Sequence, residues 1–205
     1  KSVEFIKNSI VFCEEIQADL YTFHPGFVFE VVHPNKSERN FDFKFNTAKK
    51  VNWEDANKLM VESVNEIIEF ANRTGVSLAL ETGGSLTNPE ANLLQKITDF
   101  EYLFHNLSKP IGINLNLAHS YLASKYWGFS ICELFDFLQP VCVASELSKI
   151  NQSVDAHLPV TGHEPYFEFA SKLFADGTPI ILEYRQTETK EIAQSINVCR
   201  KAFNV

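Results

Sequence analysis

The chain has 205 residues, 45% of them hydrophobic and 13% aromatic, so it can bury a full core as one domain. This composition excludes a disordered or fibrous protein, and the formal net charge of -8 disfavours a broad basic surface for nucleic acid. The sequence contains no run of apolar residues long enough to cross a membrane and opens on no signal-peptide core, so we expect a soluble cytoplasmic protein.

Hydrophobic periodicity divides the chain into alternating helices and strands. The first half predicts a helix over 2–17, a strand over 19–23, a long connection over 27–52, a helix from Asn52 to Gly75 and a strand over 76–80. The second half predicts helices over 88–107, 121–138 (interrupted at Gly128), 164–175 and 187–203, with strands over 111–117, 139–144 and 179–183. No hairpin signal is evident, so the order predicts an α/β fold with a parallel sheet.

The four cysteines lie far apart and form no C-x-x-C pair. They are Cys13, Cys132, Cys142 and Cys199. Each occurs in an apolar or helical context, which predicts reduced, buried thiols.

Polar residues with metal-ligand chemistry follow several of the apolar runs. Glu81 ends the run over 76–80 and is followed by a Gly-Gly turn, which indicates a buried strand that delivers its carboxylate to the C-terminal rim of a sheet. His24 is followed by Pro25, which keeps it out of the helical region, and Glu183 ends the last strand. One such match means little, but the repetition argues that the strands direct polar groups toward one point.

Two further motifs are consistent with this arrangement. Asn116 and His119 are three residues apart at a strand end, and Asp155 and His157 are two apart in a segment that would project both to one side. Alone, the first fits a hydrogen-bonded core histidine, and the second fits an exposed turn. The combined set offers three imidazoles and three carboxylates, the ligand chemistry of zinc or manganese. Its members are His24, Glu81, His119, Asp155, His157 and Glu183.

The order of the motifs resembles the xylose-isomerase-like TIM-barrel superfamily, which includes endonuclease IV (AP endonuclease family 2) and the sugar isomerases and epimerases. The motifs are H-P-G at 24–26, L-E-T-x-G at 80–84, N-x-x-H at 116–119, D-x-H-L-P-x-x-G at 155–162 and I-L-E at 181–183. The resemblance implies a TIM (β/α)8-type barrel with a metal site at its C-terminal face. The five strand-helix units match the last five of eight. We therefore expect a single domain over 1–205 that lacks N-terminal units of roughly 80 to 90 residues.

The resemblance to endonuclease IV also assigns individual residues. His119, Asp155 and His157 correspond to the complete ligand set of one of three zinc ions, and Glu81 corresponds to a bridging carboxylate. His24 and Glu183 also match ligands of that family. Two departures are evident, because Asn116 replaces an Asp and the strand that ends near Ser145 lacks the expected His. His163 replaces a usual Gly, and it is either an additional ligand or a plain loop residue.

Three functions follow from this comparison. The first is hydrolysis of a phosphodiester or sugar-phosphate bond, in abasic DNA or a small sugar phosphate, with zinc as the cofactor and Glu81 and Glu183 as catalytic residues. The alternative is a sugar or sugar-phosphate isomerase or epimerase that uses manganese or magnesium, in which the same two carboxylates move a proton. The third is a non-catalytic protein with an eroded site. No feature indicates the oligomeric state.

The long connection over 27–52 has two interpretations. The resemblance implies a loop that covers the mouth of the barrel, where Lys36, Arg39, Lys44, Lys49 and Lys50 could contact a phosphate. A solvated surface with balanced charge explains the same residues.

Overall fold

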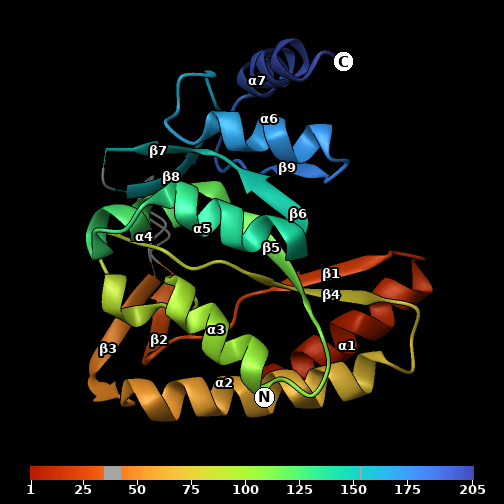
Figure 1. The fold of residues 1–205 in the computed structure, drawn as a ribbon, viewed down its shortest axis with the longest axis vertical. Helices are drawn as coiled ribbons and strands as arrows, with labels where there is room; N and C mark the ends of the chain where they lie inside the picture. The colour runs from red at the N-terminus through yellow and green to blue at the C-terminus, as the bar shows by residue number, and fades with distance from the viewer. Residues whose placement is uncertain (35–42, 153) are drawn as a thin grey trace.

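Five parallel strands form the central sheet of the computed structural model, which describes residues 1–34, 43–152 and 154–205 (Figure 1). Their spatial order is β1-β4-β5-β6-β9, and every neighbouring pair is parallel. The bounds are β1 Leu20–Phe23, β4 Ser77–Glu81, β5 Gly112–Asn116, β6 Cys142–Leu147 and β9 Ile180–Leu182. The predicted parallel sheet is therefore confirmed.

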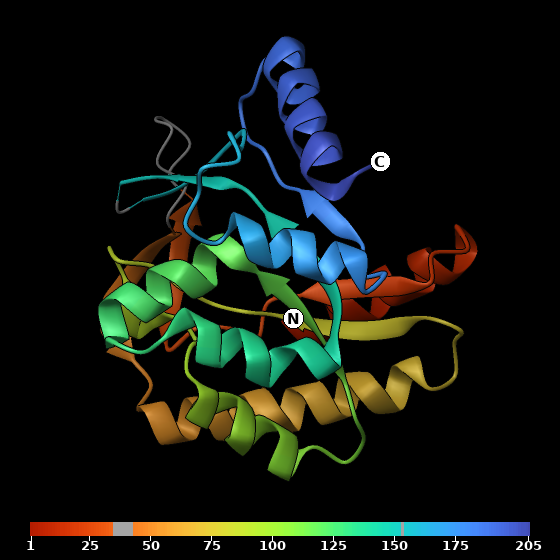
Figure 2. The same cartoon turned by 45° about the horizontal axis from the view of Figure 1, so that its top comes forward.

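Helices connect successive strands and cover the outer side of the sheet (Figure 2). The α-helices are α1 Ser2–Glu15, α2 Trp53–Ala71, α3 Ile97–Asn106, α4 Leu117–Trp127, α5 Ile131–Leu138, α6 Phe167–Ala175 and α7 Thr189–Phe203. Two 3-10 turns, η1 Pro89–Ala91 and η2 Gln139–Val141, precede α3 and β6. The helix expected from Asn52 begins as α2, and the Asn52 side chain caps it by accepting a hydrogen bond from the Asp55 amide at 2.8 Å.

The sheet curls into a half-barrel. Its middle strands are buried on both faces, as the apolar runs predict, and Leu80 and Ile113 are fully buried. In the part of the chain that the structure describes, β1 and β9 are edge strands that do not pair with each other. An α/β fold with five barrel strands is what an incomplete TIM barrel would give.

Two antiparallel ribbons interrupt the parallel pattern, contrary to the prediction of no hairpin. β2 Phe29–Pro34 pairs with β3 Phe43–Lys50, and β7 Lys149–Asn151 pairs with β8 Val154–Leu158. Both ribbons lie in segments that follow the carboxyl end of a barrel strand, where insertions do not disturb the barrel.

Three local predictions need correction or refinement. The helix expected over 88–107 is divided: η1 ends at Ala91, Leu94 adopts a positive φ of 53° in the connection, and α3 begins only at Ile97. The interruption expected at Gly128 is confirmed, since this residue closes α4 in a left-handed conformation. The four cysteines form no disulfide, but of the predicted buried thiols only Cys199 is buried, since Cys13 and Cys142 are half-buried and Cys132 is exposed. None of the described helices is both long and apolar enough to cross a membrane.

Candidate active site

The six predicted ligand residues lie around one pocket at the carboxyl ends of the barrel strands. The space between its lining atoms is about 490 Å3, a figure that includes open solvent at the pocket mouth. Its lining comprises His24, Phe45, Glu81, Gly84, Ser85, Asn88, Asn92, His119, Asp155, His157, Glu183 and Arg185. The topology explains this convergence, because His24, Glu81 and Glu183 end or directly follow parallel strands, while the β7-β8 ribbon supplies Asp155 and His157.

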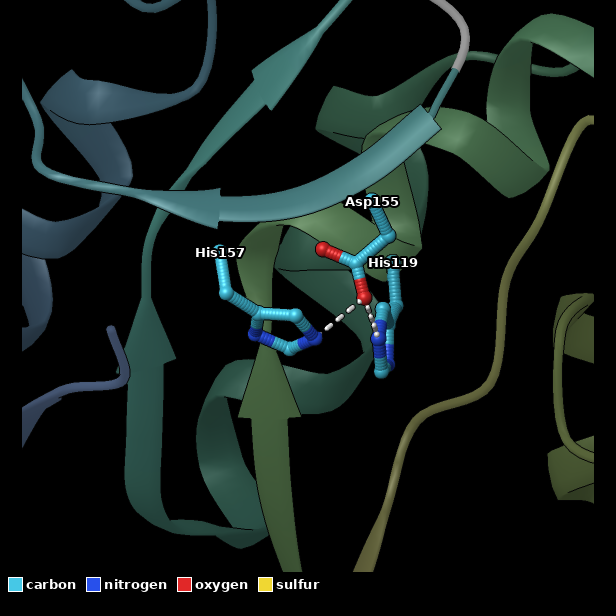
Figure 3. A group of neighbouring side chains, drawn as sticks. All are labelled: His119, Asp155 and His157. Carbon is cyan, nitrogen blue, oxygen red and sulfur yellow. Dashed lines mark hydrogen bonds and ion pairs between the residues drawn. The ribbon is translucent and has the colours of Figure 1, made fainter. Parts of the chain in front are cut away.

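Two imidazoles converge on one carboxylate oxygen (Figure 3). Asp155 Oδ2 lies 2.8 Å from His119 Nε2 and 2.8 Å from His157 Nε2. The possible ligand atoms of the three residues all lie within 4.8 Å of one another, and the three residues are buried. We call these residues the His-Asp-His triad.

The imidazole of His119 is held with its Nε2 toward Asp155. Its Nδ1 lies 2.9 Å from the carbonyl oxygen of Thr82, which can only accept a hydrogen bond, so Nδ1 carries the proton. Its backbone amide donates to Asn116 Oδ1 at 3.1 Å, because Asn116 caps α4. A backbone carbonyl behind a ligand histidine is the usual support of a metal-binding imidazole.

His157 occupies an unusual backbone conformation inside β8. Its φ is +45°, in the left-handed region that costs a non-glycine residue about 1–2 kcal/mol. The amide of Arg185 donates to the His157 carbonyl at 3.0 Å and ties the residue to the segment after β9. Its Nδ1 lies 2.9 Å from Glu183 Oε2, a close charge contact that lacks hydrogen-bond geometry. This strained residue is therefore held between two carboxylates, which points to a functional role.

The triad residues fit a divalent metal ion. Asp155 Oδ1 is buried with no hydrogen-bond partner, and His157 Nδ1 is in the same condition. Two imidazole nitrogens and one carboxylate form the donor set of three-ligand zinc sites, which leave a fourth position open. An ion within this triad would replace the contacts that the two imidazoles now make with Asp155.

The triad residues perturb one another electrostatically. Burial lowers the pKa of His119, but the carboxylates of Asp155 and Glu81 outweigh that effect and raise it well above 6.5. The pKa of His157 is raised by the same balance, with Asp155 and Glu183 as its partners. Burial raises the pKa of Asp155, yet the two imidazoles hold it far below its usual range. Without metal, the ionised Asp155 therefore favours the protonated form of both imidazoles.

We expect the metal-free protein to lose stability as the pH rises above 6.5. Because the folded pKa of His119 is raised, its contribution is complete below the unfolded value of 6.5 and disappears as the pH passes the folded pKa. Melting temperatures measured between pH 6 and 9 with a chelator present should therefore fall. Zinc should reduce this decline, because the ion binds neutral imidazoles, while the part due to the raised pKa of Glu146 should persist.

Two variants separate this effect from the general titration of the surface. His119→Gln should flatten the decline, whereas His163→Gln should leave it unchanged because His163 is exposed and outside the pocket lining. A melting temperature of the metal-free wild type that is constant or rises over this range would contradict the electrostatic assignment.

Glu81 belongs to a second cluster beside the triad. Its carboxylate lies 3.3 Å from His24 Nε2 and 3.2 Å from His119 Nδ1, and it accepts a hydrogen bond from Asn116 at 3.0 Å. Burial raises the pKa of Glu81, but the hydrogen bonds and charges of His119 and His24 hold it at about 2. Glu81 is therefore ionised.

The sequence interpretation missed Glu146. This residue follows Ser145 in β6, at the strand end where a His was expected and found absent, and its carboxylate accepts hydrogen bonds from Asn114 at 2.7 Å and Asn116 at 3.0 Å. Burial, with repulsion from Glu81 and Glu183, raises its pKa to about 8. The detectable signal was a carboxylate at the end of an apolar run, the pattern already used for Glu81.

The ribbon β2-β3 contributes one aromatic side chain, Phe45, to the pocket lining. Lys49 and Lys50 form ion pairs with Glu30 and Glu90 at 2.9 and 3.6 Å. Lys36 and Arg39 lie outside the described residues, as does the side chain of Lys44. Among the described lysines and arginines, the one that lines the pocket is Arg185, which the sequence interpretation did not identify.

The comparison with known families gives a match along almost the whole chain. The family model described as a xylose isomerase-like TIM barrel matches residues 1–202. No curated protein sequence matches the chain.

Several solved structures share the fold. A D-tagatose 3-epimerase-like protein has a TM-score of 0.71 and 16% identity, covering 98% of this chain and 68% of that one. D-psicose 3-epimerase with D-tagatose from Clostridium cellulolyticum H10 has a TM-score of 0.67 and 13% identity, covering 98% and 70%. The 3-keto-D-glucoside 4-epimerase of E. coli has a TM-score of 0.66 and 13% identity, covering 97% of this chain and 70% of that one. This chain thus spans about two thirds of each relative, and the likeness concerns the fold.

Proposed function

This chain belongs to the xylose isomerase-like TIM-barrel family, and from that premise we propose that it is a divalent-metal-dependent isomerase or epimerase of a sugar or sugar phosphate. The named structural relatives are sugar epimerases, which favours this reaction over the phosphodiester hydrolysis that the sequence interpretation placed first. We also propose that further N-terminal strand-helix units precede this sequence in the full protein and complete the barrel.

The observation that carries the proposal is the placement of two carboxylates beside the triad. Glu81 ends β4 and Glu183 directly follows β9, and both line the pocket. β5 and β6 separate their strands, so the two side chains approach a bound sugar from different directions. Isomerisation and epimerisation remove a proton from a carbon next to a carbonyl and return it elsewhere, which requires positioned acid-base groups.

The metal would occupy the His-Asp-His triad. When bound there, it would supply Lewis-acid polarisation of the substrate's carbonyl oxygen. The chain's own residues hold the remaining charges in place. His24 and Asn116 fix the Glu81 carboxylate, while His157 and Arg185 contact Glu183.

The two carboxylates differ in their access to substrate. The Glu183 side chain is 31% exposed, against 10% for Glu81, so a sugar in the pocket reaches Glu183 more freely. Burial raises the pKa of Glu183, but His157 lowers it by more, so the pKa falls below its usual value and the ionised group can accept a proton. We assign proton abstraction to Glu183, which then carries the proton. Glu81 is ionised, so it would return a proton on the other side only after taking one up from solvent.

Exchange of substrate protons with solvent tests this assignment. The purified protein, loaded with zinc or manganese, is incubated in D2O with a panel of ketoses and ketose phosphates, and loss of the α-proton signal is followed by NMR. We expect exchange with at least one sugar, and Glu183→Gln should reduce its rate by about 100-fold or more, the usual contribution of a general base. Glu168→Gln, a control on the exposed surface of α6, should leave the rate unchanged.

Hydrolysis remains the second candidate because the triad matches a zinc ligand set of endonuclease IV. Its assay is nicking of a duplex that contains an abasic site, under the same metal conditions. Nicking without proton exchange would reject the isomerase or epimerase proposal in favour of hydrolysis. If the folded, metal-bound protein showed neither proton exchange nor nicking, the non-catalytic alternative would be favoured.

A further inference from the structure

A neutral amide lies between two carboxylates next to the triad. Asn116 Nδ2 is 3.0 Å from Glu81 Oε1 and 3.0 Å from Glu146 Oε2. An amide nitrogen carries two hydrogens, so it can donate one to each carboxylate. Asn116 therefore links Glu81 on β4 to Glu146 on β6 across the strand that carries it.

The surrounding hydrogen bonds determine the orientation of this amide. Asn116 Oδ1 accepts a hydrogen bond from the His119 amide at 3.1 Å as the cap of α4. The opposite orientation would direct Nδ2 at the His119 N–H group and Oδ1 at the ionised Glu81 carboxylate, and both of these contacts would be repulsive. The N–H side of Asn116 must therefore face Glu81 and Glu146, and it offers no lone pair to a cation there.

Each of the three acidic side chains at the carboxyl ends of β4, β6 and β9 has donors or imidazoles of its own. The contacts are His24 and His119 with Glu81, Asn114 with Glu146, and His157 and Arg185 with Glu183. The cluster of Glu81, Asn116 and Glu146 thus does not fit a metal ion.

We infer that this chain holds one divalent ion, in the His-Asp-His triad, and that the Asn116 amide takes the place of a second cation between Glu81 and Glu146. Hard divalent cations require oxygen ligands at such a position. An Asp at residue 116 would supply one and would still accept the capping hydrogen bond from His119. It would also bring three carboxylates together, an arrangement that a cation stabilises. The inference concerns the number of ions and does not depend on which reaction the protein catalyses.

Metal content measured by mass spectrometry tests the inference. Wild-type protein equilibrated with zinc and then with manganese, and freed of unbound metal, should contain one ion per chain. Asn116→Asp should contain two, the second of them manganese. Once the triad is filled with zinc, added manganese should raise the melting temperature of Asn116→Asp but not that of the wild type.

Asn114→Asp provides the matched control. It introduces the same charge on the same strand. The backbone of Asn114 pairs with that of Glu81, but its described side-chain hydrogen bond goes to Glu146 and not to Glu81. This variant should keep one ion. Two or more ions in the wild type would overturn the inference, even if Asn116→Asp failed to fold. A second ion in Asn114→Asp, or none gained by a folded Asn116→Asp, would also overturn it.

Discussion

Replacing Asp155 with Asn is expected to lower zinc affinity by more than about 100-fold. Loss of a residue that merely supports a ligand costs about 10- to 100-fold, and Asp155 is the central carboxylate of the triad, 2.8 Å from both imidazoles. The amide keeps the size of the side chain but removes its charge. Titration calorimetry with a competing chelator measures the change, and Asp136→Asn, on the exposed side of α5, should leave the affinity unchanged.

The same substitution should change stability in a pH-dependent manner. Below pH 6.5 the metal-free wild type gains from protonated imidazoles that face Asp155, and the variant lacks this gain. The difference in unfolding free energy should therefore be largest in mild acid and shrink as the imidazoles lose their protons. Zinc affinity that matched the wild type's would exclude Asp155 as a ligand.

The positions of the barrel strands were predictable because a buried parallel strand appears in the sequence as a short apolar run with a clear end. The run over 76–80 gave β4 within one residue, and Glu81 ends that strand. A chain that alternates such runs with amphipathic helices folds into parallel units, so residues at successive strand ends converge. The convergence of His24, Glu81 and His119 follows from that rule alone.

The ribbons could not be predicted on the same grounds. β7 and β8 have only three and five residues, and β8 carries a polar Asp155 and a His157 at φ +45°. Local propensity does not favour such a strand. Its side chains instead form contacts within the site, and hydrophobic periodicity does not reveal such tertiary contacts. The pairing of Asp155 and His157 was visible as a motif, while the strand that presents them was not.

Glu146 shows a different limit. The expected residue type at the end of β6 was a His, and a carboxylate one position beyond Ser145 did not meet that expectation. Its relation to Asn116 and Glu81 depends on the register of three neighbouring strands, including a shift between Ile113 and Asn114. Periodicity places residues on a strand, but a one-residue shift decides which of them face each other.

Gly84→Ala is expected to destabilise the protein by about 3 kcal/mol or more and to impair metal binding. A Cβ atom at Gly84 would lie 1.9 Å from the carbonyl oxygen of His119, which is backbone and cannot rotate away. Overpacking usually costs about 1–3 kcal/mol, and a contact this short requires the loop after Glu81 and the first turn of α4 to separate. That separation would displace His119 from Asp155, so zinc affinity should decrease together with stability.

The matched control is Gly75→Ala, in the turn that precedes β4. No atom lies within 4 Å of the position of its Cβ, and its φ is not in the left-handed region, so its free energy of unfolding should remain within about 1 kcal/mol of the wild type's. Urea unfolding and zinc titration of both variants separate a local clash from a general effect of losing glycine. If Gly84→Ala matched Gly75→Ala in both measurements, the close packing of the loop against α4 would not be what positions His119.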